Sequence, residues 1–456
     1  MGRDSQPARA EWRGTEQSIA SSTLPPQLLK MGPPGRAYPV ALLLMPAMLF
    51  LGGSEGAFVD YEGWKILGVH LENVSGNAYP PTLSKLEDMD AEGYLVVLSA
   101  SKAKGIAEVA ASPKALEDLT KMQDDGLITF EVISNNLGKE LDLEERAQGK
   151  DFPRNSITFS SYMTFSQMSS YLETLQAKHP SKVRVDEVGK SFENRPIYRV
   201  RITNNIGNNI KKKVVFIDGG IHAREWVSPP AAFYAIEKLI ANTKLTKSIE
   251  WQIIPMLNPD GYVYTWNQNR LWRKNRSPSS VCVGVDLNRN FGYQWGGLGT
   301  SSYPCSDLYR GPSAFSEPES RALRDAMLPL DGRVKAYITF HSYGQYILYP
   351  WGYSTDVTHP LTASMNKAGR VMAKRIQRKT QATYNVGNSA EAFYPAAGAS
   401  DDWASYTLSV PYVYTIELRD TGEGGFILPA PEILPTVKDA WLAVKYMGSL
   451  VRKKTR

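Results

Sequence analysis

The pattern of apolar and polar positions divides the chain into alternating strands and helices from about residue 156 to its end. Short apolar runs predict strands at 198–202, 214–217, 251–255, 334–340 and 412–418. Apolar residues three and four positions apart predict helices at 165–176, 230–241, 317–328, 361–379 and 435–451. Such alternation is typical of an α/β domain in which a largely parallel sheet lies between helices.

Residues 58–150 differ in pattern and in charge. Apolar alternation predicts strands at 64–69, 94–98 and 127–133, with a helix that begins at Ser112. The whole chain has a formal charge of +6, but this region is rich in acidic residues: Glu87, Asp88, Asp90, Glu92, Glu117, Asp118, Asp124, Asp125, Asp142, Glu144 and Glu145. An acidic region joined to a more basic one suggests electrostatic docking between them, although an independent acidic domain has the same charge pattern.

The first 56 residues have the pattern of a targeting segment. Residues 1–30 are polar and without periodicity, so we expect an unstructured extension. Arg36 precedes the apolar run 40–51, which is too short to span a bilayer and is followed by small residues. This layout at residues 31–56 is typical of a secretory signal peptide, and a buried core helix is the alternative. We therefore expect a secreted, extracellular protein with no membrane partner.

A polar segment with several basic residues separates the acidic region from the larger domain. Its Arg146, Lys150 and Arg154 suit a trypsin-like protease, and exposed segments of this kind are preferred sites of cleavage. We place the domain boundary there, with one domain at 57–154 and the other at 155–456. The basic residues of the chain are spread out rather than gathered in one run, so we expect no nucleic-acid partner.

The strand predicted at 214–217 leads into a polar cluster. The chain passes through two glycines, which suit a sharply bent backbone, to His222 and then Glu225. A helix follows, and its first residues suggest Ser228 as the N-cap. The polar side chains therefore stand at the carboxyl end of a strand, where open α/β sheets bind their ligands.

His222 and Glu225 have the spacing of two metal ligands, but this spacing alone is more often found in a surface turn. The chain has five histidines, and of the other four only His341 ends a second predicted strand, at 334–340. Two His and one Glu at strand ends make a possible zinc site, with three protein ligands and one position open for water.

Three further features suggest chemistry, and each has an alternative. Arg and Asn residues are dense near 269–274 and 285–291, as in a solvated loop or in a clamp for a substrate carboxylate. Glu417 stands inside an apolar strand, where a carboxylate is rare unless it is paired or functional. Cys282 and Cys305 are most simply a disulfide in a secreted protein. Metal ligation by them is the weaker interpretation, because there is no CxxC pair.

Five short motifs occur in order along the larger domain: His222-Ala-Arg-Glu225-Trp, Leu-Trp-Arg273-Lys, Val-Asp-Leu-Asn288-Arg289-Asn, Phe-His341-Ser-Tyr and Ile-Glu417-Leu-Arg-Asp-Thr-Gly. Together they resemble the zinc metallocarboxypeptidases of the pancreatic A/B type, and most closely the B-type proenzymes. The resemblance covers the chain except residues 1–30. It implies an α/β fold, with a mixed eight-stranded sheet flanked by helices and preceded by a small α+β pro-domain. The pro-domain would keep the enzyme latent until cleavage near Arg154.

The resemblance also implies roles for individual residues. One zinc ion per chain would have His222, Glu225 and His341 as its ligands. The other roles are those of general base (Glu417), polarisation of the scissile carbonyl (Arg273), substrate binding (Arg224, Asn288, Arg289, Tyr343, Tyr394 and Asp401) and orientation of His222 (Asp286). Three cis peptide bonds are implied at Ser342–Tyr343, Pro350–Trp351 and Arg419–Asp420.

The resemblance places Asp401 at the base of the pocket for the C-terminal side chain. An acidic residue there marks the B type and an apolar one the A type, and a buried carboxylate favours Lys or Arg. The alternative is that Asp401 points away and that Asp402 has a structural role alone. Ser389 departs from the glycine that B-type members tend to have on the pocket wall.

We therefore expect a monomeric, secreted zymogen that hydrolyses the C-terminal bond of peptides and proteins and prefers C-terminal Lys or Arg. Its partners would be substrates with a free C-terminus and an activating trypsin-like protease. An enzyme of A-type preference and a catalytically silent binding module on the same fold are the alternatives. Loss of Glu417, Arg273 or a zinc ligand would favour the silent module, and all of these residues are present.

Overall fold

The structure is a computed structural model that describes residues 58–147, 155–208 and 211–453. The extension at 1–30, the signal peptide at 31–56 and the cleavage segment at 148–154 lie outside the described residues. All described residues belong to one unit, which spans residues 55–456. Of the helices in the described ranges, none is long and apolar enough to cross a membrane.

The larger domain is built on an eight-stranded mixed sheet, as expected, with the strand order β11-β10-β12-β9-β7-β8-β6-β5. The strands are β5 (Val183–Lys190), β6 (Pro196–Ile202), β7 (Lys213–Gly219), β8 (Ile249–Ile254), β9 (Val334–His341), β10 (Tyr346–Tyr349), β11 (Asn385–Asn388) and β12 (Val413–Glu417). The central strands β12, β9, β7 and β8 are parallel to one another, whereas β10, β6 and β5 pair antiparallel with their neighbours on the central side.

A largely parallel sheet, as the alternation of elements predicted, is therefore correct at the centre and for the edge pair β10–β11, but not for the sheet as a whole. β5 and β6 are joined by five residues, and β9 and β10 by four. Connections this short cannot carry a parallel crossover, which needs a dozen residues or more. β6 and β10 consequently run opposite to the central strands, and β5 reverses once more.

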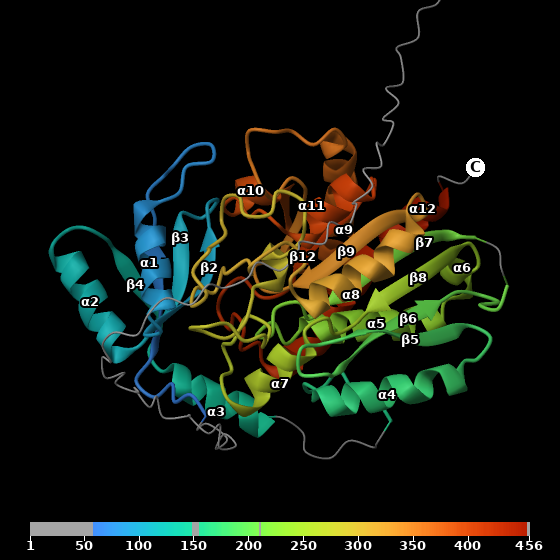
Figure 1. The fold of residues 1–456 in the computed structure, drawn as a ribbon, viewed down its shortest axis with the longest axis horizontal. Helices are drawn as coiled ribbons and strands as arrows, with labels where there is room; N and C mark the ends of the chain where they lie inside the picture. The colour runs from blue at the N-terminus through green and yellow to red at the C-terminus, as the bar shows by residue number, and fades with distance from the viewer. Residues whose placement is uncertain (1–57, 148–154, 209–210, 454–456) are drawn as a thin grey trace, which may run out of the picture. The chain divides into compact units, whose positions relative to one another are not determined.

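Helices cover both faces of the sheet (Figure 1). One face packs against α4 (Phe165–Lys178), α5 (Ser228–Ile240), α9 (Thr362–Thr380) and α12 (Ala430–Lys453), and the other against α8 (Pro318–Met327) and α11 (Ser400–Thr407). The central strand β7 shows why both faces are covered: Val215 and Ile217 enter the first core, and Val214 and Phe216 enter the second. An apolar run of this kind is typical of a parallel strand buried on both sides.

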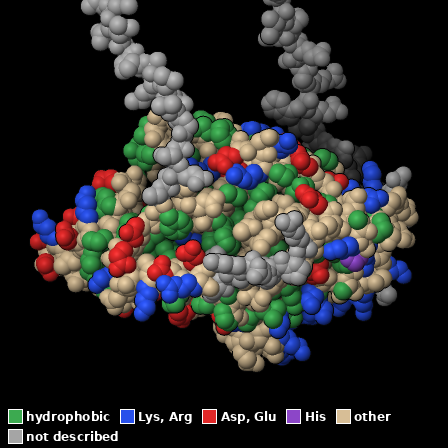
Figure 2. All heavy atoms as spheres, turned by 90° about the horizontal axis from the view of Figure 1, so that it is seen from below, with side chains coloured by type: hydrophobic (Ala, Val, Ile, Leu, Met, Phe, Trp, Pro, Cys, Tyr) green, Lys and Arg blue, Asp and Glu red, His purple; other side chains and the backbone are tan. Residues whose placement is uncertain are grey.

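Residues 58–147 form a second, four-stranded antiparallel sheet in the order β2-β3-β1-β4. Its elements are β1 (Lys65–His70), β2 (Leu95–Ser101), β3 (Ile106–Ala111), β4 (Phe130–Ser134), α1 (Pro81–Ala91), α2 (Pro113–Asp124) and α3 (Leu137–Ala147). Ser112 caps α2 as expected, because its Oγ accepts from the Ala115 amide at 3.2 Å. Figure 2 shows acidic side chains interspersed with basic ones at its left, on the side where this region lies.

Ser228 is not the N-cap of α5, so that expectation was wrong. It is the first residue of the helix, and its buried hydroxyl accepts from the Gly220 amide at 2.8 Å and donates to the Phe340 carbonyl at 2.6 Å. The hydroxyl thus ties the bend after β7 to the end of β9. The capping role is lost because two buried backbone groups use the hydroxyl instead.

The disulfide and the three cis peptide bonds are present. Cys282 and Cys305 are bonded to each other, which removes metal ligation by these thiols. The peptide bonds Ser342–Tyr343, Pro350–Trp351 and Arg419–Asp420 are all cis, as the resemblance implied.

The substitution Ser228→Ala should lower the free energy of unfolding by about 1–3 kcal/mol, because it leaves a buried N–H and a buried C=O without their partner. Urea unfolding followed by tryptophan fluorescence measures this change. Ser364→Ala, at an exposed position of α9, is the control and should change the value by less than about 0.5 kcal/mol. An equal effect of the two substitutions would contradict the assigned role of the Ser228 hydroxyl.

Candidate active site

The candidate site lies at the carboxyl ends of the three adjacent parallel strands β7, β9 and β12. The loop after β7 carries His222 and Glu225, and His341 is the last residue of β9. Glu417 ends β12 and stands opposite His341 in the register of the two strands. Parallel pairing therefore brings residues that are almost 200 positions apart to one edge of the sheet.

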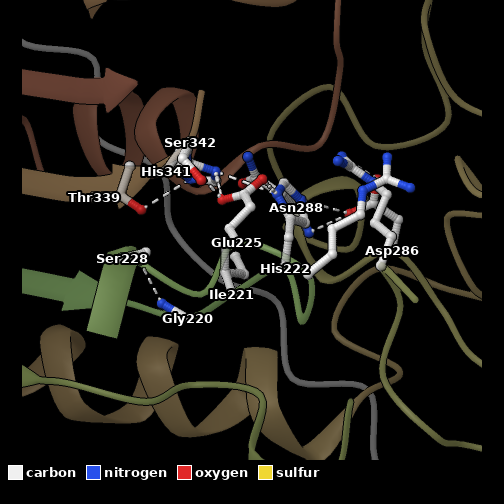
Figure 3. A network of polar contacts seen from close by, with 12 residues as sticks. Gly220, Ile221, His222, Glu225, Ser228, Asp286, Asn288, Thr339, His341 and Ser342 are labelled. Atoms are coloured by element: carbon white, nitrogen blue, oxygen red, sulfur yellow. Dashed lines mark hydrogen bonds and ion pairs between the residues drawn. The ribbon is translucent and has the colours of Figure 1, made fainter. Parts of the chain in front are cut away.

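Three side chains converge as a metal site would require (Figure 3). His222 Nδ1 lies 2.6 Å from one oxygen of Glu225, and His341 Nδ1 lies 3.2 Å from the other. The two Nδ1 atoms are 3.2 Å apart, and all three residues are buried. Two nitrogens bound at about 2.0–2.1 Å to a tetrahedral zinc ion are about 3.3 Å apart, so this donor set fits zinc.

Asp286 connects His222 to the predicted substrate residues. One of its oxygens lies 3.2 Å from His222 Nε2 and accepts from the Asn288 amide at 2.9 Å. The other accepts from Arg273, through Nε at 3.0 Å and Nη2 at 2.8 Å. Burial alone would raise the pKa of Asp286, but Arg273, Arg289 and His222 together bring it well below its ordinary value. The carboxylate therefore stays ionised and orients His222.

His341 has an outer contact that the sequence analysis missed. Its Nε2 lies 3.1 Å from Thr339 Oγ1, and that hydroxyl donates to Asp218 Oδ1 at 2.8 Å. Thr339 and Asp218 are fully buried. Both are polar residues inside apolar strands, which is the signal that selected Glu417, so the same criterion applied to every strand would have found them.

All eleven residues predicted to bind metal or substrate or to act in catalysis line one cavity: Arg224, His222, Glu225, Arg273, Asn288, Arg289, His341, Tyr343, Tyr394, Asp401 and Glu417. Burial, opposed by the charge of His341, raises the pKa of the Glu417 carboxyl to about 8. The cavity is closed on another side by residues of the 58–147 region, including Tyr79, Glu87 and Asp90.

Of the three arginines that line the cavity, Arg289 and Arg224 are held differently from Arg273 and from each other. Arg289 donates to the Gly299 carbonyl through Nε at 2.7 Å and to the Asn288 carbonyl at 3.1 Å. Asn288 Oδ1 accepts from the Ser400 amide at 2.9 Å, so the side chains of the Asn288–Arg289 pair are fixed in place. Arg224 instead donates to Asp307 at 3.0 Å and to the carbonyl of Val97, a residue of β2, at 3.0 Å.

Asp401 is one of the residues that line the cavity. It is 4 % exposed, and its carboxylate accepts from Thr415 Oγ1 at 2.9 Å and from the Asp402 amide at 2.9 Å. Asp402 has a different position, because its carboxylate accepts from the amides of Gly352 and Tyr353 at 2.9–3.0 Å. The two neighbouring acids therefore have different partners, and only Asp402 holds the loop at Gly352 and Tyr353.

Comparison with known proteins identifies the family. The family model described as zinc carboxypeptidase matches residues 168–443. The chain is 38 % identical over 305 residues to a carboxypeptidase B of Astacus astacus, which covers 64 % of this chain and 98 % of that protein. It is 33 % identical over 408 residues to zinc carboxypeptidase A 1 of Drosophila melanogaster, and this match covers 86 % of this chain and 93 % of that protein. The crystal structure of carboxypeptidase A from Helicoverpa armigera superposes with a TM-score of 0.78 at 31 % identity, over 87 % of this chain and 98 % of that one.

The Thr339 contact generates a prediction about zinc retention. Thr339→Val removes the hydroxyl between His341 and Asp218 and should weaken zinc binding about 10–100-fold, whereas Thr339→Ser keeps the hydroxyl and should stay within about threefold of the parent protein. Competition with a chromogenic chelator measures the affinity, and thermal unfolding of the metal-free proteins controls for a packing defect. A valine variant that retains zinc as well as the serine variant would rule out this contact as a support of the site.

Proposed function

The chain belongs to the zinc carboxypeptidase family, and from this premise we propose that it is a secreted proenzyme that removes C-terminal Lys or Arg from peptides and proteins. The coarser activity, zinc-dependent hydrolysis at the C-terminus of a peptide, is that of the family. The observation that carries the finer assignment is the buried carboxylate of Asp401 on the wall of the cavity that also holds the metal-binding cluster.

We assign the chemical step to residues around that cluster. His222, Glu225 and His341 would hold the zinc ion, which would act as a Lewis acid and would lower the pKa of a water molecule to about 7. Glu417 accepts a proton from the attacking water and returns it to the leaving amine. Arg273 donates to the scissile carbonyl oxygen as negative charge develops there, and its ion pair with Asp286 holds it in place for this task.

Binding of the terminal carboxylate explains why the enzyme would act only at a chain end. We assign this task to Arg289 and Asn288, because a guanidinium and a carboxylate pair through two parallel hydrogen bonds. Both residues line the cavity beside the metal-binding cluster. Tyr394 also lines it, and we assign to this ring the role of closing over the bound residue.

The choice between B-type and A-type preference depends on Asp401. The relatives include proteins named carboxypeptidase B and carboxypeptidase A 1, so similarity alone favours neither type. A buried carboxylate gains most from a partner cation that is also removed from water, and it disfavours an apolar side chain that leaves it unpaired. We therefore favour Lys and Arg over Phe or Leu at the substrate terminus.

We propose that residues 57–154 are an activation domain that blocks the cavity. Tyr79 of this region packs against the ring of Tyr394 with centroids 5.5 Å apart, and Glu108 accepts a hydrogen bond from the Tyr343 hydroxyl. Val97 accepts from Arg224. These contacts involve three of the residues assigned to substrate binding, so a substrate and this region cannot occupy the cavity together.

A buried ion pair anchors the end of this region next to the expected cleavage segment. Glu144 of α3 accepts from Arg270 through two hydrogen bonds of 2.6 and 2.9 Å, and both side chains are at most 5 % exposed. Arg270 also lies over the ring of Trp226 at 3.8 Å. The pair fixes α3 immediately before residues 148–154, where we propose that a trypsin-like protease cuts.

Secretion completes the proposal. The apolar segment at 31–56 has the layout of a signal peptide, and a disulfide between Cys282 and Cys305 is characteristic of proteins that fold in an oxidising compartment. A catalytically silent binding module is disfavoured because each residue needed for the reaction is present and lines the cavity.

Replacing Asp401 tests the proposed specificity. In the trypsin-treated enzyme, Asp401→Ala should lower kcat/KM for a peptide ending in Arg about 100-fold or more, because the substrate cation loses its buried partner. The value for the same peptide ending in Phe should fall by less than about threefold or rise. Asp356→Ala, outside the cavity, is the matched control. An equal loss for both peptides would contradict the assignment of Asp401.

Glu144→Gln tests the anchor of the activation domain. The substitution leaves Arg270 buried without its counter-charge, which costs about 3–5 kcal/mol in comparable pairs. We expect the uncleaved variant to hydrolyse substrate measurably faster than the uncleaved parent, while the two cleaved enzymes have the same kcat/KM. Glu145→Gln, at the exposed neighbouring position, controls for loss of one charge in α3. If the uncleaved Glu144 variant is as inactive as the uncleaved parent, the Glu144–Arg270 pair does not help to keep the activation domain over the cavity.

A further inference from the structure

A surface of one charge sign lies on two helices that do not line the active-site cavity, α9 and α12. Helix α9 contains six basic residues and no Asp or Glu. All six are exposed: Lys367, Arg370, Lys374, Arg375, Arg378 and Lys379. The sequence has no acidic residue at all between Val357 and Ala390, so the loops that flank α9 do not offset this charge.

Helix α12 extends the same surface. The two helices pack in one apolar core, and the Arg375 guanidinium of α9 lies 4.8 Å from the ring centre of Tyr446 of α12. Three lysines of α12 are exposed: Lys438, Lys445 and Lys453. These three residues and the six of α9 are called the α9–α12 basic surface below.

The acidic residues of α12 do not neutralise this surface. They are Glu432 and Asp439, and both form ion pairs with Arg419, at 3.2 and 2.7 Å. Asp439 is also fully buried. The nine cations of the α9–α12 basic surface are therefore not matched by acidic side chains of the two helices that carry them.

The arrangement of the cations suits a long, thin anion. Lys367, Arg370, Lys374 and Arg378 follow one another at intervals of three and four positions, which places them along one side of α9. At a rise of 1.5 Å per residue this row is about 17 Å long. Lys438, Lys445 and Lys453 follow one another at intervals of seven and eight positions, which places them along one side of α12, and packed helices lie about 8–10 Å apart. At one end, a groove with His359 in its wall is lined by Lys367 and Arg370.

We propose that the α9–α12 basic surface binds a linear sulfated polysaccharide. A membrane surface is disfavoured because, in the described part of the chain, no large apolar side chain of α9 is exposed and only Leu434 of α12 is. A nucleic acid is disfavoured because single-strand binding uses exposed aromatic rings for stacking, and Tyr446 is half-buried beneath Arg375. Sulfated chains are extracellular, so this choice of occupant agrees with the proposed secretion.

Binding at this surface leaves the active site open. No residue of α9 or α12 lines the cavity, which lies at the carboxyl ends of the strands, whereas the two helices cover a face of the sheet. A bound polysaccharide would therefore hold the enzyme at a fixed place while peptides still reach the zinc site. Such a chain should not inhibit hydrolysis.

Heparin is the probe for the test, used with the full-length proenzyme in 0.15 M salt. We expect the triple variant Lys367→Gln, Lys374→Gln, Arg378→Gln to bind at least about tenfold more weakly than the parent, with a slope of log affinity against log salt that is smaller by about two to three. The control triple, Lys121→Gln, Lys139→Gln, Lys190→Gln, removes the same charge from exposed positions elsewhere and should lose at most about twofold.

Further measurements separate the alternatives. Hydrolysis after trypsin treatment and thermal unfolding should be the same for both triple variants, because none of the six residues lines the cavity or is buried. Absence of heparin binding in 0.15 M salt, or an equal loss in both triple variants, would overturn the proposal. Tighter binding to a DNA oligonucleotide or to phosphatidylserine vesicles than to heparin would assign the surface to a different partner and also overturn it.

Discussion

The buried charge of Asp286 is the constraint on which the active site depends. This carboxylate is fully removed from water, and a charge in that position is tolerated only when it is paired and hydrogen-bonded. Arg273, the Asn288 amide and His222 surround it. The contacts of this one carboxylate therefore hold in place the residues that we propose as oxyanion donor, as one part of the carboxylate clamp and as one zinc ligand. Arg273 and His222 lie outside the helices and strands, and Asn288 lies in a 3-10 helix of only three residues, Leu287–Arg289.

Much of the catalytic domain was predictable from local pattern. Apolar runs predicted the central strands, because a parallel strand covered by helices on both faces must be apolar almost throughout. The position of His341 at the end of β9 predicted its convergence with His222, since parallel strands present their carboxyl ends at one edge. Asp401 and Tyr394 carry no such signal. Their expected roles came from the family resemblance alone, and their place in the cavity wall depends on loop conformations that pattern does not encode.

Other features could not be predicted because they depend on tertiary contacts. Ser228 has the residue type and position of a helix cap, but two buried backbone groups occupy its hydroxyl. Strand β3 is rich in alanine, a residue of high helix propensity, and becomes a strand because β1 and β2 pair with both of its edges. The acidic composition of residues 58–150 suggested docking by charge, and Glu144 does pair with Arg270. The contact of Tyr79 with Tyr394, in contrast, is between two aromatic rings and could not be predicted from the charge pattern.

The most direct test of the central claim compares two peptides that differ only in a C-terminal Arg or Phe, before and after treatment of the proenzyme with trypsin. The account predicts little release before treatment and, afterwards, release of Arg far ahead of Phe that a zinc chelator abolishes and added zinc restores. Faster release of Phe would contradict the role of Asp401 while leaving the zinc chemistry intact. Absence of release from processed, zinc-loaded protein would contradict the account as a whole.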